Sequence, residues 1–139
     1  MGVAARGEAL AQAAEAQLAR VREVLATRLA ATRPTVYYGR GSDGLESGLS
    51  GSINTEVIEF CGGRNVAASA GAGGLARVSF EQLLAWDPDV ILTQDAGFAA
   101  HAAQDPRWRA LRAVRERRLH CAPVLPFGWL DGPPGINRL

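Results

Sequence analysis

Residues 78–93 read VSFEQLLAWDPDVILT and contain two signals of an α/β chain, a capped helix and a buried strand. Ser79 can cap a helix over residues 80–86, because its hydroxyl can accept a hydrogen bond from a backbone N–H of the first turn. The Asp-Pro pair that follows ends this helix. Residues 90–93 form a continuous apolar run, which is typical of a strand buried on both faces. The stretch therefore predicts a helix that leads into a parallel strand.

Similar signals recur on both sides of this stretch. Ser52 is a reasonable N-cap with Glu56 at or near the capping-box position, and Asp105 followed by a proline is a typical helix start. We expect strands over residues 35–38, 90–93 and 119–124, and helices over residues 53–61, 80–86 and 106–114. Strands that alternate with helices predict an α/β fold with a mostly parallel sheet flanked by helices.

A long helix is predicted before the first strand, over residues 5–31, and Pro34 ends it. Its apolar residues recur at spacings of three and four: Leu10, Ala14, Leu18, Val21, Leu25 and Leu29. The stripe is narrow, so we expect this helix to pack along its length against a partner. Residues 1–33 are assigned to the helix and residues 34–139 to the α/β unit. This opening, and a helix that only begins at residues 136–139, predict that the chain is a fragment.

Composition excludes several classes of protein. The 139 residues, 47% of them apolar, are enough for one domain with one core. The formal net charge of +1 does not indicate a nucleic-acid or membrane-surface partner. All 15 basic residues are Arg, which removes the lysine of Schiff-base enzymes and of P-loops. No apolar run is long enough for a transmembrane helix, and residues 1–6 lack the features of a signal peptide.

The two cysteines do not form a C-x-x-C pair. Cys61 and Cys121 lie far apart in the sequence. An oxidising compartment would allow a bridge between them, but we expect two buried free thiols.

A glycine-rich loop over residues 39–51 follows the first strand, and Gly39, Gly41 and Gly44 spell G-x-G-x-x-G. A dinucleotide site needs a helix that opens inside this motif, so that the pyrophosphate lies on the helix N-terminus. Here further glycines and serines separate the motif from the next predicted helix, and no acidic residue ends a second strand about 20 residues on. The context therefore argues against a nicotinamide or flavin site.

Hydrolytic and metal chemistry find no support in the sequence. His101 and His120 are isolated, and Ser47 does not lie in a G-x-S-x-G motif. No cluster of His, Cys, Asp and Glu has metal-ligand spacing. The acids Asp43, Glu46 and Asp95 are expected to be solvated loop carboxylates. We therefore expect no catalytic residue, no cofactor and no metal site.

The loops after the predicted strands collect aromatic, cationic and hydrogen-bonding side chains. These are Tyr37, Tyr38 and Arg40 after the first strand, Asp95 and Phe98 after the next, and Phe127 and Trp129 after the last. The ends of parallel strands share one edge of the sheet, which is the usual ligand edge of open α/β folds. One of the two tyrosines must face inward, and Trp86 and Trp108 are expected to pack within or onto the core. The pattern predicts a small-molecule binding site.

Residues 52–66, SINTEVIEFCGGRNV, together with residues 78–91 resemble the C-terminal lobe of substrate-binding proteins that serve ABC importers for ferric siderophores and vitamin B12. The resemblance covers roughly residues 5–139, and the first segment resembles the long helix that joins the two lobes in that family. It implies one lobe of a bilobal, non-catalytic binding protein whose N-terminal lobe is absent here. The parent protein would be periplasmic, or lipid-anchored outside a Gram-positive cell.

The family implies a metal chelate such as a ferric siderophore as ligand, with vitamin B12 or an oxyanion as alternatives. Glu81 resembles the acid that docks onto arginines of the ABC permease. Ligand contacts in the family come from the strand-end loops, which here contain Tyr38, Arg40, Leu75, Asp95, Phe127 and Trp129. Two other classes stay open: a nucleotide-binding enzyme that uses the loop from Gly39 to Gly44, and a non-catalytic interaction domain.

Overall fold

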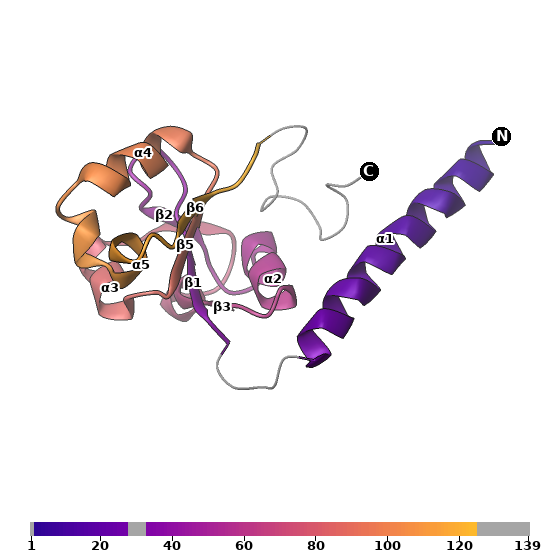
Figure 1. The fold of residues 1–139 in the computed structure, drawn as a ribbon, viewed down its shortest axis with the longest axis horizontal. Helices are drawn as coiled ribbons and strands as arrows, with labels where there is room; N and C mark the ends of the chain where they lie inside the picture. The colour runs from indigo at the N-terminus through magenta and orange to yellow at the C-terminus, as the bar shows by residue number, and fades with distance from the viewer. Residues whose placement is uncertain (1, 28–32, 125–139) are drawn as a thin grey trace.

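The computed structural model describes residues 2–27 and 33–124 (Figure 1). The helices are α1 (Val3–Thr27), α2 (Ile53–Phe60), α3 (Phe80–Trp86), α4 (Ala96–Gln104) and α5 (Arg112–Arg115), with 3-10 turns η1 (Val66–Ala70) and η2 (Trp108–Ala110). The strands are β1 (Thr35–Tyr38), β2 (Glu46–Gly48), β3 (Arg64–Asn65), β4 (Leu75–Arg77), β5 (Val90–Thr93) and β6 (Leu119–Cys121). The predicted α/β fold with a parallel sheet and a long first helix is confirmed.

Four of the strands form a parallel sheet in the order β3-β1-β5-β6. Tyr38 lies opposite Leu92, so β1 and β5 end at the same level. A right-handed crossover through a helix is the usual way to join parallel neighbours, and it brings all strand ends to one side. Strands β2 and β4 form a separate antiparallel pair beside the sheet.

Helices α3, α4 and α5 cover one face of the sheet, and α2 covers part of the other (Figure 1). On the first face, Trp108 makes edge-to-face contacts with Phe80 and Phe98, at ring-centroid distances of 5.2 and 4.7 Å. The prediction that Trp108 packs in the core is confirmed. The two tyrosines of β1 are both buried, Tyr37 in this cluster and Tyr38 in the cluster under α2.

Both predicted serine caps form. The Oγ of Ser79 accepts a hydrogen bond from the N–H of Gln82 at 3.1 Å, and the Gln82 side chain accepts one from the N–H of Ser79 at 3.0 Å. This is a complete capping box. Ser52 accepts from the N–H of Thr55 at 3.2 Å, while Glu56 lies one position further into the helix than a capping-box acid.

Helix α1 contains no buried residue. Its contacts with the lobe are at its C-terminal end, where the Arg22 guanidinium lies 5.5 Å from the centre of the Phe60 ring and Leu25 lies beside Gly62. Of the predicted apolar stripe, Leu25 contacts the lobe, and Ala14, Leu18 and Val21 are half-buried. The expectation that the stripe packs along its whole length stays a prediction. Residues 28–32, at the predicted end of the helix, lie outside the described part.

The single helix predicted over residues 106–114 is wrong. Leu111 has an extended backbone, with φ −76° and ψ 135°, and separates η2 from α5. This conformation buries the Leu111 side chain completely. The carboxylate of Asp87, at the end of α3, accepts a hydrogen bond from the N–H of Arg112 at 2.8 Å and so provides a cap for the second piece.

The structure also contains short helices and strands that the sequence did not predict. Helix α4 was not predicted, because its sequence AGFAAHAAQ has little apolar periodicity. The pair β2 and β4, and the two-residue strand β3, were also missed, because they are held by tertiary pairing. Strand β6 ends at Cys121, earlier than predicted, and residues 136–139 lie outside the described part.

The expectation of two buried thiols is wrong, since Cys61 and Cys121 are both free and both exposed. Cys61 is the C-cap of α2, and Cys121 ends the outer strand β6, so neither lies in a helix–sheet interface. Over the described ranges, no helix has the length and apolar character to cross a membrane.

Candidate ligand-binding edge of the sheet

The carboxyl ends of β1 and β5 place predicted site residues side by side. Arg40 follows β1 by two residues and Asp95 follows β5 by two residues, and these strands are parallel neighbours. The N–H of Gly39 donates to the carbonyl of Leu92 at 2.9 Å, which continues the pairing beyond the strands. We call this region, with Arg40, Gln94 and Asp95, the ligand edge.

Tyr38 is buried next to the ligand edge and contacts two of its side chains, Arg40 and Gln94. Its side chain is only 1% exposed and packs with Val36 and Ile58. The Oη of Tyr38 accepts a hydrogen bond from the Gln94 amide at 2.9 Å, and the Arg40 guanidinium lies 5.7 Å from the Tyr38 ring centre. The ring is therefore a buried support for two polar side chains, and its direct contact with a ligand stays a prediction.

The glycine loop is shaped by packing against a phenylalanine. Gly44 has φ +68°, and a Cβ at this position would lie 2.2 Å from a ring atom of Phe98. The Oη of Tyr37 donates a hydrogen bond to the Gly44 carbonyl at 2.9 Å, and burial raises the pKa of this tyrosine. The loop then leads into β2 and not into a helix. Glycine here permits close packing and a left-handed backbone, which needs no bound phosphate.

Charges along this loop lie in pairs. The Arg40 Nε lies 3.6 Å from a Glu46 carboxylate oxygen, and backbone bonds in both directions join these residues. Arg77 of β4 hydrogen bonds and pairs with Asp43. The hydrogen bond from Arg77 is the main reason that the pKa of Asp43 lies below its ordinary value. The acids predicted as solvated loop carboxylates therefore help to hold the loop in place.

Asp95 is the N-cap of α4. Its Oδ1 accepts a hydrogen bond from the N–H of Phe98 at 2.7 Å, and its own N–H donates to the Thr93 hydroxyl at 3.0 Å. The cap orients α4 so that Phe98 is completely buried. Asp95 is thus positioned rigidly at the ligand edge, and its contact with a ligand stays a prediction.

The remaining predicted site residues lie outside the ligand edge or outside the described part of the chain. Leu75 lies in β4 opposite Gly48 and is 47% exposed. Glu81 is exposed in the first turn of α3, and within residues 33–124 it forms no ion pair. Phe127 and Trp129 lie outside the described residues.

Gln94 was not among the predicted site residues. It follows β5 directly and donates to the Tyr38 hydroxyl. Its place immediately before Asp95, after a buried strand, is the signal that would have identified it.

The chemistry available at the ligand edge is recognition by hydrogen bonds and charge. Among the residues that the structure describes, no three His, Cys, Asp or Glu side chains gather as a metal site. His101, predicted to be isolated, pairs with Asp105 one turn along α4 at 3.2 Å and is exposed. The Arg40 guanidinium and the Gln94 carboxamide offer donors, and the Asp95 carboxylate accepts, so the edge suits a polar ligand that carries both acceptors and donors.

The family of periplasmic binding proteins matches residues 1–123, and the chain belongs to this family. The resemblance seen in the sequence is therefore confirmed.

Two solved structures and one curated relative illustrate the likeness. An ABC transporter solute binding protein from Sulfurospirillum deleyianum has a TM-score of 0.85 and 32% identity, over 96% of this chain and 42% of its own. The molybdate-bound structure of MolA from Haemophilus influenzae has a TM-score of 0.79 and 28% identity, over 96% of this chain and 40% of its own. The curated molybdate-binding protein MolA is 31% identical over 82 residues, which are 58% of this chain and 23% of MolA.

A third solved structure is of a protein named for a different ligand. The periplasmic heme-binding protein RhuT from a Roseiflexus species, in apo form, has a TM-score of 0.77 and 29% identity, over 99% of this chain and 53% of its own. The chain thus spans about half, or less, of each of these proteins.

Proposed function

We propose that this chain is one lobe of the solute-binding component of an ABC importer, which captures a metal chelate such as a ferric siderophore in the periplasm and delivers it to a membrane permease. Membership of the periplasmic binding protein family is the observation that carries this proposal. The gathering of polar side chains at one edge of a parallel sheet supports it, because open α/β folds bind ligands there.

The proposed ligand contacts are the residues expected from the sequence, Tyr38, Arg40, Leu75, Asp95, Phe127 and Trp129, with Gln94 added. Of these, Tyr38 lies at the end of β1 and Leu75 in β4. The Arg40 guanidinium is a forked, cationic group of N–H donors and can donate to carboxylate, catecholate or hydroxamate oxygens of a chelate. Its contact with the buried Tyr38 ring restricts its rotamers, which lowers the entropy lost on binding. A second lobe would close over this edge and exclude water from the ligand.

We further propose that Glu81 is the contact for the permease. The carboxylate is exposed at the start of α3, where the helix dipole stabilises its charge. An arginine on the permease would form a charge-assisted hydrogen bond with it.

A second candidate ligand is an oxyanion. The observation that favours it is the similarity to MolA, which binds molybdate. The same guanidinium and amide donors serve either ligand, because a tetrahedral oxyanion and a chelate both present several anionic oxygens.

Calorimetric titration of the chain with ferrichrome, ferric enterobactin, hemin, cyanocobalamin and molybdate separates these candidates. We expect one ligand class to bind, and Arg40→Ala to weaken that binding about tenfold, as expected for loss of a charge-assisted bond. Arg64→Ala is the matched control, because Arg64 lies at the opposite ends of the strands, beside Thr35. Equal loss in both variants, or binding of no ligand, would count against this ligand edge.

The permease contact has its own test, with the importer's permease–ATPase complex reconstituted in liposomes. Glu81→Arg should abolish stimulation of ATP hydrolysis while ligand affinity stays unchanged, since Glu81 is outside the ligand edge. Glu81→Gln should have an intermediate effect. Unchanged stimulation by the Glu81→Arg variant would refute the docking role.

A further inference from the structure

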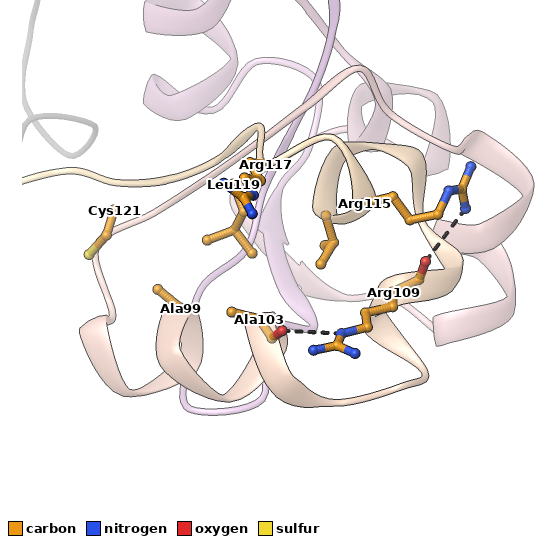
Figure 2. A pocket seen from close by; sticks show the side chains of 8 residues that line it. Ala99, Ala103, Arg109, Arg115, Arg117, Leu119 and Cys121 are labelled. Atoms are coloured by element: carbon orange, nitrogen blue, oxygen red, sulfur yellow. Dashed lines mark hydrogen bonds between the residues drawn. The ribbon is translucent and has the colours of Figure 1, made fainter.

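An open hollow of about 810 Å³ lies between α4, η2, α5 and β6, on a part of the lobe that the proposed function does not use. Its apolar lining consists of Ala99, Ala103, Val114 and Leu119. Figure 2 shows Cys121 at one end of the hollow and Arg109 and Arg115 at the other. The hollow is open to solvent on one side, so a chain segment can enter it without a rearrangement of the lobe.

Three arginines line this hollow: Arg109, Arg115 and Arg117. Nearby arginines of the same region are paired, Arg112 with Asp87 and Asp89 and Arg118 with Glu116. Within the described ranges, none of the three lining arginines has a carboxylate within ion-pair distance. The hollow therefore carries a local excess of positive charge, although the chain as a whole is nearly neutral.

Two of these guanidinium groups are held by backbone carbonyls. The Arg109 Nε donates to the carbonyl of Ala103 at 3.3 Å (Figure 2). The Arg115 Nη1 donates to the carbonyls of Ala110 and Arg109. A guanidinium has five N–H donors, so each keeps several for another acceptor. Because the carbonyls fix the two side chains, less rotamer entropy is lost when an anionic partner binds.

Strand β6 is the outer strand of the described sheet, next to this hollow. The N–H of Ile91 donates to the carbonyl of Arg118 at 3.0 Å, and the N–H of Ala122 donates to the carbonyl of Thr93 at 2.7 Å. Backbone groups alternate along a strand, so Leu119 and Cys121 direct theirs away from β5. In residues 33–124 these outward groups have no backbone partner. They are free to pair with an added strand.

We propose that β6 and the hollow form a docking site for an extended acidic segment of a partner protein. The segment adds to the sheet as a strand beside β6 and places carboxylates on Arg109, Arg115 and Arg117. Strand addition supplies the main-chain hydrogen bonds, and side chains at alternate positions of the segment reach the hollow. Leu119 and Cys121 share one face of β6 and both line the hollow, which matches this alternation.

The charge requirement is tested with a fluorescein-labelled peptide, Gly-Glu-Val-Glu-Val-Glu-Val-Glu-Gly, by fluorescence anisotropy with the full chain. We expect binding that weakens as salt is added, and about tenfold weaker binding when every Glu of the peptide is replaced by Gln. Equal affinity of the two peptides would overturn the proposal.

Strand addition is tested without altering the protein. Two versions of the peptide carry N-methyl groups on alternate residues, one set on the odd and the other on the even positions. One set must face β6, so one version should lose binding and the other should retain it. Equal binding of both versions would overturn strand addition.

The protein side is tested with the triple variant Arg109→Gln, Arg115→Gln and Arg117→Gln. We expect about a tenfold loss of affinity or more for the acidic peptide. Arg64→Gln is the control, because this exposed arginine lies on β3, at the other side of the sheet.

Two other occupants would overturn the proposal. Light scattering that shows a dimer, which the triple variant dissociates, would assign β6 to a second copy of the chain. Displacement of the peptide by glutarate at the same concentration as by unlabelled peptide would assign the hollow to a small anion.

Discussion

The two faces of the parallel sheet are built very differently. Among residues 2–27 and 33–124, twelve buried residues form one cluster on the face covered by α3, α4 and α5, whereas four form the cluster on the α2 face. The larger cluster is organised around Trp108 between Phe80 and Phe98. The smaller one joins Val36 and Tyr38 of β1 to α2. Hydrophobic stabilisation grows with buried apolar area, so within the described residues the larger cluster contributes more of it than the smaller one.

The sparse face is the one connected to α1 and to the ligand edge. Arg22 and Leu25 of α1 contact residues at the end of α2, and the Tyr38 hydroxyl accepts from Gln94. We therefore expect substitutions on the α2 face, near α1 and the ligand edge, to destabilise the lobe less than substitutions in the larger cluster, which keeps the lobe folded. This difference can be tested by substitutions matched between the faces.

The largest effect is expected from Phe98→Ala. The Phe98 ring is completely buried, contacts Trp108 and fills the space beside Gly44. Its removal should lower the free energy of unfolding by about 3–5 kcal/mol, measured by urea denaturation. A loss below about 1 kcal/mol would mean that this face does not dominate stability.

Ile58→Ala tests the other face. Ile58 lies in α2 and is buried, but within the described residues its cluster is small and its neighbours Val90 and Leu92 are only partly buried. We expect a loss of about 2–3 kcal/mol, at the low end for such substitutions, because the site can relax toward solvent. Leu83→Ala, at a completely buried position on α3, is the matched control and should cost more.

Removing the helix caps should have a smaller effect. Ser52→Ala and Ser79→Ala each remove a cap, at a cost of about 1 kcal/mol. The cost should be larger for Ser52, which is buried and also donates to the Thr55 hydroxyl, than for the exposed Ser79. Chemical denaturation of both variants measures the difference, and a larger loss for Ser79 would contradict this account.

The smallest effect concerns the pH dependence of stability and Asp89, which joins the start of β1 to α5. Asp89 accepts hydrogen bonds from the N–H and hydroxyl of Thr35, each at 2.8 Å, and pairs with Arg112 at 2.9 Å. The bonds from Thr35 are the main cause of its pKa lying below the ordinary value. Its contribution to stability is present above the unfolded-state pKa of about 3.9 and is lost as the pH falls through the lower folded-state value.

Asp89→Asn should therefore flatten the fall in stability on acidification below about pH 4, by a fraction of a kcal/mol. Thermal melts at several pH values measure this slope. Glu116→Gln is a control, because Glu116 is exposed and pairs only with Arg118 among the described residues. An unchanged slope for Asp89→Asn would exclude this role.

Local sequence signals predicted a helix correctly where the residues that cap and end the helix lie within the same short segment. Helix α3 was placed correctly because Ser79 and Gln82 form its capping box and an Asp-Pro pair follows. They failed over residues 106–114, where the cap of α5 comes from Asp87, a residue 25 positions earlier. The burial of Leu111 and the course of β2 likewise depend on neighbours that are distant in the chain.

The same distinction holds for the candidate site. Arg40 and Asp95 were recognisable because both follow strands, and parallel strands end at a common edge. The hydrogen bond between Gln94 and Tyr38 could not be predicted, because these residues are 56 positions apart in the chain. The cap formed by Asp95 is local, since it joins Asp95 to Phe98 three residues further on, and it was missed because helix α4 itself was not predicted.

Caps, proline positions and apolar runs were sufficient to establish the α/β class, the long first helix and the edge at which polar side chains gather. They are local because each acts through hydrogen bonds or steric limits within a few residues. Only the packed fold revealed the unequal faces, the paired charges of the glycine loop, the exposed thiols and the arginines beside β6. Burial and ion pairing depend on which distant segments meet, and that is settled by the whole chain packing together.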